Sequence, residues 1–127
     1  SAAYAARARE LGITVIGRDT ITASAAGAIA STALEIAGRG GGRVFLDVDV
    51  DVCDRSVVPA CPSAAPGGIS AHELRRLVFE LVSDPRVAAM DVTEIDATTD
   101  AADGRTVRLA ALLVLEAAAA MRSRAHS

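Results

Sequence analysis

Residues 44–52 constrain the fold more than any other segment, because branched apolar side chains alternate there with Asp47, Asp49 and Asp51. A period of two is typical of a β-strand, and it places the three carboxylates on one face of that strand. Burying three unpaired carboxylates in an apolar layer costs too much free energy. The pattern therefore predicts one of two arrangements. Either a buried strand uses these carboxylates to bind a hard divalent cation, or an edge strand leaves them solvated.

Helical and extended patterns alternate along the whole chain. Strands are predicted at residues 13–16, 44–52 and 87–95, and helices at residues 1–11, about 20–37, 71–83 and 106–121. Helices between successive strands imply parallel strands joined by right-handed crossovers. The predicted fold class is therefore α/β, a three-layer αβα arrangement with a parallel central sheet. Three strands are few for a stable open sheet, so we expect further strands to come from elsewhere.

Two of the predicted helices carry stronger signals. Ser70 and Glu73 have the spacing of a capping box at the start of the third helix. The apolar stripe of that helix has regular helical spacing and consists of Leu74, Leu77, Val78, Leu81 and Val82. The last helix is apolar nearly all round, so we expect it to lie between layers or against a partner.

Composition limits the function classes. Thirteen Arg and no Lys stand against sixteen acidic residues, and aromatic residues make up only 2% of the chain. Nucleic-acid binding, which uses a basic face and stacking aromatic side chains, is therefore not expected. No apolar stretch free of charge is long enough to span a membrane. No signal peptide is visible, and we expect Cys53 and Cys61 to be free thiols of a cytoplasmic protein.

A second group of acidic residues, Asp91, Glu94 and Asp96, lies at the end of the third predicted strand. Ligands of open α/β sheets bind beyond the carboxyl ends of the strands. A carboxylate there can hold a guanidinium or amidinium group through two parallel hydrogen bonds. The alternative is an acidic residue that caps the loop or pairs with Arg105 or Arg108.

Two stretches together resemble the C-terminal signature of the ureohydrolase family, which comprises arginase, agmatinase and formimidoylglutamase. The first stretch runs from Asp49 to Asp54 and continues through a proline-containing loop into Gly67-Gly68-Ile69-Ser70 at the start of a helix. The second stretch is residues 90–96. The resemblance covers about residues 43–120. It implies the C-terminal part of an arginase-like fold, within a single α/β domain formed by residues 1–127.

The resemblance also implies site residues and chemistry. Asp49 would bridge two manganese ions, Asp51 would bind one of them, and Glu94 would hold the amidine or guanidine group of a small-molecule substrate. Asp54 would support the loop, and no residue of this chain is assigned a direct catalytic role. The metal pair would activate a water molecule for attack on the amidine carbon, giving an amine plus urea or formamide. We expect a cytoplasmic homo-oligomer with no nucleic-acid or membrane partner.

The chain departs from the family pattern at three places. Arg55 stands where many members have Pro, Asp47 adds an acidic residue, and residues 61–65 replace a Gly/Thr-rich loop. These departures leave the substrate open between a formimidoylglutamase-like and an agmatinase-like choice, with a slight preference for the first. The other metal ligands of the family, two His and two Asp, lie in an N-terminal half that this chain does not resemble. We therefore expect a C-terminal fragment of a longer enzyme, which alone binds manganese weakly and is inactive.

Two alternatives use the same residues. Asp49 and Asp51 also resemble the nucleophile and general acid of the haloacid-dehalogenase phosphatases, which use Mg²⁺ and a downstream Lys that this chain lacks. The other alternative is a non-catalytic α/β module whose apolar last helix drives oligomerisation. An assay with a generic aryl phosphate separates the first alternative from a ureohydrolase, and a manganese titration separates the second.

Overall fold

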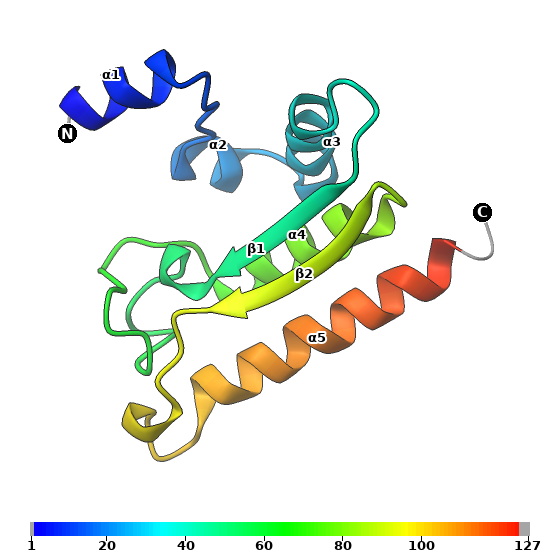
Figure 1. Cartoon of the computed structure of the whole chain (residues 1–127). Helices are drawn as coiled ribbons and strands as arrows, with labels where there is room; N and C mark the ends of the chain where they lie inside the picture. Colours follow the sequence, from blue (N-terminus) through cyan, green and yellow to red (C-terminus); the bar gives the residue numbers. More distant parts are fainter. Residues whose placement is uncertain (1, 125–127) are drawn as a thin grey trace.

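The computed structural model describes residues 2–124, in which three helices precede the first of two strands and a long helix follows each strand (Figure 1). The elements are α1 (Ala2–Glu10), α2 (Arg18–Ala23), α3 (Ala26–Ala37), β1 (Val44–Asp49), η1 (Val50–Val52), α4 (Ala71–Ser83), β2 (Val87–Thr93), η2 (Ala97–Thr99) and α5 (Arg105–Arg124). Ser1, which the first predicted helix includes, lies outside the described residues. No described helix has both the length and the apolar character needed to cross a membrane.

β1 and β2 form a parallel two-stranded sheet, with α4 as the helix that connects them (Figure 1). The register pairs Leu46 with Met90 and Asp47 with Asp91. Parallel neighbours need a crossover connection, and α4 supplies it. The predicted α/β class with a parallel sheet is therefore confirmed.

α4 lies at the centre of the packing, because α3 packs against it on one side and α5 on the other (Figure 1). Its predicted apolar stripe is confirmed: Leu74, Leu77, Val78 and Val82 are buried. The capping box is also confirmed, since the Ser70 hydroxyl accepts the Glu73 N–H at 3.2 Å and the Glu73 carboxylate accepts the Ser70 N–H at 2.7 Å. α4 is therefore the helix that organises the core.

α5 is buried along one face rather than all round. Its buried residues are Thr106, Leu109, Leu113, Ala117 and Ala120. On other faces of the helix, Val114 and Leu115 are 55% and 63% exposed. The sheet is similarly one-sided in the described part of the chain. Val48 is buried in the core, whereas Phe45, one residue from the strand start, is 61% exposed.

The strand predicted at residues 13–16 is absent. This segment forms no ladder with any described strand, and Ile13 and Val15 are 55% and 72% exposed. A strand satisfies its backbone N–H and C=O groups through a neighbouring strand. The β-branched side chains of this segment favour an extended conformation, but the described residues provide no strand beside it.

The single helix predicted over about residues 20–37 is two helices. Ser24 and Ala25 have extended backbones, with φ/ψ of −122°/156° and −67°/138°, and they separate α2 from α3. Ser competes with helix formation through local hydrogen bonds and favours helix ends. Ala25, predicted on the apolar side of one helix, is therefore exposed at this junction, while Ile29 is buried on α3.

Candidate active site

The first acidic segment does not continue as a strand to its end. β1 ends at Asp49, and Val50–Val52 form the 3₁₀ helix η1. The Asp49 carboxylate caps this turn by accepting the Asp51 N–H at 3.0 Å. The prediction that Asp47, Asp49 and Asp51 share one strand face is therefore wrong for Asp51, because the turn moves it off the strand.

The loop after η1 returns to the end of β1 and is fixed there by backbone contacts. Ile69 donates its N–H to the Val52 carbonyl at 2.9 Å and accepts the Asp54 N–H at 3.0 Å. A Cβ at Gly68 would lie only 2.2 Å from the Cys53 carbonyl carbon. Glycine is therefore required at residue 68, which explains the second glycine of the Gly-Gly-Ile-Ser stretch.

Asp54 holds both ends of this loop. Its carboxylate accepts the Ser56 hydroxyl at 2.6 Å, the Ser56 N–H at 2.9 Å and the Gly67 N–H at 2.7 Å. The Ser56 hydroxyl, followed by the Gly67 and Ser56 N–H groups, lowers the pKa of Asp54 to about 2. This geometry agrees with the supporting role that the resemblance implies for Asp54.

The two acidic segments meet at Ser63. The Ser63 hydroxyl donates to the Glu94 carboxylate at 2.9 Å, although the two residues are 31 positions apart in the chain. Asp51 belongs to the same group of side chains. Burial first, and then the negative charges of Asp49 and Glu94, raises the pKa of Asp51 against an opposing hydrogen bond with Ser63. The structure therefore brings Asp49, Asp51 and Glu94 together at the carboxyl ends of β1 and β2.

Glu94 reaches this group through an unusual backbone conformation. Its φ of 64° is the only positive φ at a non-glycine residue in the described chain. A left-handed backbone at a residue with a Cβ costs about 1 kcal/mol, and such strain is often found at functional sites. β2 ends at Thr93, so the strand predicted to run to residue 95 stops two residues earlier and Glu94 lies beyond its end.

The remaining acidic residues have other environments. Asp96 caps η2 by accepting the Thr98 N–H at 3.0 Å and the Thr98 hydroxyl at 2.6 Å, which is the loop-capping alternative. Asp47 and Asp91 are paired neighbours on the exposed face of the sheet. Desolvation and the charge of Asp47 raise the pKa of Asp91. These three residues lie apart from the contacts that join Asp51, Ser63 and Glu94.

Asp49 and Asp51 fit a metal centre only as part of its ligand set. Their carboxylate oxygens are the hard ligands that manganese and magnesium prefer. However, residues 2–124 contain no group of three or more His, Cys, Asp or Glu side chains placed to hold a metal ion. Cys53 and Cys61 are buried free thiols, and burial raises the pKa of Cys53 to about 11. The thiols therefore do not complete the ligand set.

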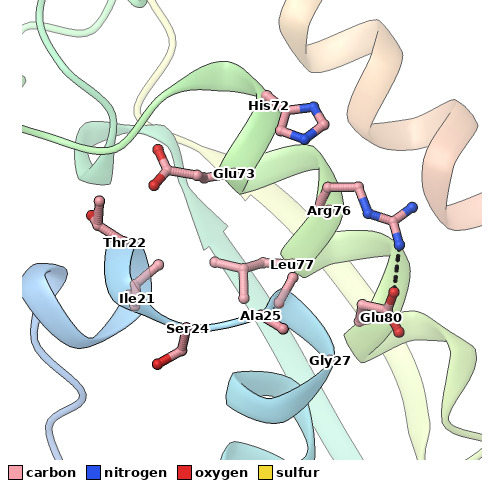
Figure 2. Close-up of a pocket in the computed structure, with 11 residues that line it drawn as sticks. Ile21, Thr22, Ser24, Ala25, Gly27, His72, Glu73, Arg76, Leu77 and Glu80 are labelled. Carbon is pink, nitrogen blue, oxygen red and sulfur yellow. Dashed lines mark hydrogen bonds and ion pairs between the residues drawn. The ribbon is translucent and has the colours of Figure 1, made fainter.

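A separate cavity of about 370 Å³ lies between the α2–α3 junction and α4 (Figure 2). Its charged side chains serve local structure: Glu73 forms the capping box, and Arg76 pairs with Glu80 at 2.5 Å. His72, which also lines the cavity, is exposed. We therefore assign the chemistry to the strand ends rather than to this cavity.

Sequence reasoning missed Ser63 as a site residue. It treated residues 61–65 only as a departure from a Gly/Thr-rich loop. A hydroxyl side chain retained within that altered loop was the available signal, but its contact with Glu94 depends on long-range packing. Arg55, noted only as a replacement for Pro, also contacts this loop through its guanidinium.

Comparisons with known proteins show what this chain is similar to. The sequence model described as the arginase family matches residues 1–120. A formimidoylglutamase of Bacillus subtilis (strain 168) is 39% identical over 79 residues, which cover 62% of this chain and 24% of that protein. A mitochondrial arginase 1 of Arabidopsis thaliana is 35% identical over 82 residues, covering 65% of this chain and 23% of the relative.

Solved structures give a similar result. The crystal structure of the Bacillus subtilis formimidoylglutamase has a TM-score of 0.86 and 32% identity, covering 95% of this chain and 37% of that one. A Trypanosoma cruzi formiminoglutamase crystallised with Mn²⁺ has the same TM-score at 22% identity, covering 98% and 41%, which is a likeness of fold. The chain spans about a quarter of the length of these first curated relatives.

Proposed function

This chain belongs to the arginase family, and we propose that the protein containing it is a manganese-dependent hydrolase of linear amidines or guanidines. The meeting of Asp51 and Glu94 at the Ser63 hydroxyl carries this proposal. A carboxylate of the kind that binds metal ions and a second carboxylate, which can accept hydrogen bonds from a cationic group, therefore lie at the same strand ends. The comparisons do not favour the phosphatase alternative.

The residues of this chain have different roles in the proposed site. Asp49 and Asp51 would hold manganese, which would supply Lewis-acid chemistry at the strand ends. Glu94 accepts hydrogen bonds from the two N–H groups of a protonated amidine or guanidine, a planar pairing that also fixes orientation. Asp54 and Gly68 hold the loop that carries Ser63 against the strand ends.

We propose a formimidoyl group as the preferred substrate group, so that the products are formamide and an amine. The relative with 39% identity is a formimidoylglutamase, and its crystal structure is the structural neighbour with 32% identity. The altered loop at residues 61–65, which contacts Glu94, is consistent with a substrate other than arginine. An agmatinase-like activity, a cytoplasmic location and a homo-oligomeric assembly remain predictions.

The proposed site requires further residues from outside this chain. Two carboxylates are too few for a two-metal centre, and the relatives are much longer than the matched region. We therefore expect the 127-residue chain alone to bind manganese weakly and to turn over no substrate. The missing N-terminal half is expected to supply the other ligands.

The test uses the full-length protein that contains this chain, loaded with manganese. Release of formamide from N-formimidoyl-L-glutamate and of urea from L-arginine and agmatine is measured in parallel. We expect formamide release, and a loss of at least about 100-fold in kcat/KM for Glu94→Gln, because a hydrogen-bonded charge on the substrate loses its partner. Glu80→Gln, which alters the α4 surface, is the matched control and should keep its activity.

The alternatives give different outcomes. Urea release without formamide release would retain the hydrolase proposal and overturn the substrate preference. Hydrolysis of an aryl phosphate, with neither urea nor formamide released, would return the assignment to the phosphatase alternative. Full activity of Glu94→Gln would remove Glu94 from the substrate site.

A further inference from the structure

Arg55 holds the loop on both sides of Ser63. Its Nη1 nitrogen lies 3.2 Å from the Cys61 carbonyl oxygen, 3.2 Å from that of Pro62 and 3.4 Å from that of Ala64. The Arg55 backbone N–H also donates to the Ala65 carbonyl at 3.1 Å. One residue therefore contacts the loop backbone before and after Ser63, while Ser63 itself points its hydroxyl at Glu94.

The hydrogen bonds from Arg55 fix the backbone of the loop. A guanidinium is planar and permanently charged, and hydrogen bonds from a charged donor are stronger than those between neutral groups. Nη1 has two hydrogens for three carbonyl oxygens, so it draws the carbonyls toward one point. Carbonyl oxygens gathered in this way fix the backbone of residues 61–65, and with it the position of the Ser63 Cα.

Ser63, held in place by the loop, orients the Glu94 carboxylate through a hydrogen bond. A Ser hydroxyl has one hydrogen, so it donates to one carboxylate at a time; its 2.9 Å contact is with Glu94, and Asp51 is the other carboxylate within its reach. The Cys61 thiol lies 3.5 Å from the same hydroxyl oxygen. Glu94 has a left-handed backbone, and this contact holds its carboxylate toward the loop. Without the hydroxyl, the Glu94 side chain would lose that hydrogen bond and would adopt other rotamers.

We propose that Arg55 and Ser63 form a positioning relay for Glu94, in which Arg55 fixes the loop and Ser63 orients the carboxylate that receives the substrate. This inference deepens the proposed function and rests on it. It gives a role to two of the departures from the family pattern, Arg55 and the loop at residues 61–65. Both are positioning residues, because neither is placed against the reacting atoms.

A double-mutant cycle in the full-length protein tests the relay. The variants are Ser63→Ala, Arg55→Met and the double variant, with Ser63→Thr as the conservative rescue. Arg75→Met is the matched control, because it removes an arginine that pairs with Glu116 between α4 and α5. For each variant we measure kcat/KM for N-formimidoyl-L-glutamate, manganese content, and hydrogen–deuterium exchange of the peptides that contain residues 61–65 and Glu94.

We expect Ser63→Ala to lower kcat/KM by about 10- to 100-fold with unchanged manganese content, as for loss of a hydrogen bond to a charged group. Arg55→Met should lower it less, and the double variant should match Ser63→Ala within about twofold, because Arg55 acts through Ser63. Ser63→Thr should keep the kcat/KM of the parent, because threonine retains the hydroxyl. Arg75→Met should leave kcat/KM and the exchange of both peptides unchanged. The peptide with Glu94 should exchange faster in both single variants.

Several results would overturn the relay. If the two single effects multiply in the double variant, Arg55 acts independently of Ser63. If Ser63→Ala changes neither kcat/KM nor the exchange of the Glu94 peptide, Ser63 does not position Glu94. If the parent protein releases no product from any amidine or guanidine, the proposed function fails, and the exchange measurements alone then decide whether the relay exists.

Discussion

The segment before α3 and the remainder of the described chain differ sharply in packing, although both are rich in apolar residues. α1 and α2 contain no buried residue, and Tyr4 and Val15 are 80% and 72% exposed. From α3 onward, every long helix and both strands contribute to one hydrophobic core. The difference shows that an apolar pattern becomes a packed element only where another element offers it a face.

The two regions are joined by few contacts. The Arg18 guanidinium donates to the Gly67 carbonyl at 2.6 Å, and Ile16 and Ile21 pack partly against the core. The N-terminal region thus touches the same loop that Asp54 fixes. Because the relatives are longer than this chain, we expect the exposed N-terminal region to pack against residues outside it.

The largest expected effect is at Gly68. Gly68→Ala should destabilise the 127-residue chain by about 3 kcal/mol or more, because the new Cβ would overlap the backbone of Cys53 and Asp54. Gly17→Ala is the matched control in the N-terminal region. Gly17 has a φ of −73° and nothing within 4 Å of an added Cβ, so its cost should be about 0.5 kcal/mol. Urea unfolding followed by circular dichroism measures both, and equal costs would contradict the contrast between the regions.

A smaller contrast is expected for two valines. Val82 on α4 is fully buried, whereas Val15 is 72% exposed. Val82→Ala should cost about 2 kcal/mol through lost apolar burial and the cavity that remains, while Val15→Ala should change stability by about 0.5 kcal/mol or less. The same unfolding experiment measures this pair. A Val15→Ala cost similar to that of Val82→Ala would mean that residues 13–16 are packed in solution.

The smallest expected effect is the pH dependence of stability at Asp54, which fixes the loop that the N-terminal region contacts. Hydrogen bonds lower the pKa of Asp54 from 3.8 to about 2 in the folded chain, so its ionised form stabilises the fold. This stability is fully present above about pH 5 and is lost as the pH falls from 3.8 toward 2. We therefore expect the free energy of unfolding of the parent to exceed that of Asp54→Asn, and this difference should shrink as the pH falls. A difference that grows on acidification would contradict this explanation.

The sequence predicted the elements whose signals are local. The capping box at Ser70 and the apolar stripe of α4 depend on residues three and four positions apart, and both are present in the structure. The prediction of a strand at residues 13–16 was wrong, because a strand requires a neighbouring strand as well as β-branched side chains. The helix break at Ser24 was missed because alanine-rich sequence on both sides of it favours helix.

The candidate site was predictable only in part. Acidic residues that follow two apolar strands point to the edge of the sheet where the carboxyl ends of those strands meet, but only the resemblance to the ureohydrolase signature selects Asp49, Asp51 and Glu94 among them. The contact of Ser63 with Glu94 and the three carbonyl contacts of Arg55 were not predictable, because they depend on how a 17-residue return loop, residues 53–69, folds onto the strand ends. The left-handed backbone of Glu94 has no sequence signal either.

Manganese stoichiometry of the full-length protein tests most directly whether Asp49 and Asp51 form part of a metal centre completed by residues outside this chain. The protein is loaded with manganese, dialysed and analysed by inductively coupled plasma mass spectrometry, beside the double variant Asp49→Asn/Asp51→Asn and the double variant Asp47→Asn/Asp91→Asn. We predict about two ions per chain in the parent and in the Asp47/Asp91 variant, and a loss of most bound metal in the Asp49/Asp51 variant. Equal manganese content in all three proteins would contradict the assignment of Asp49 and Asp51 as metal ligands.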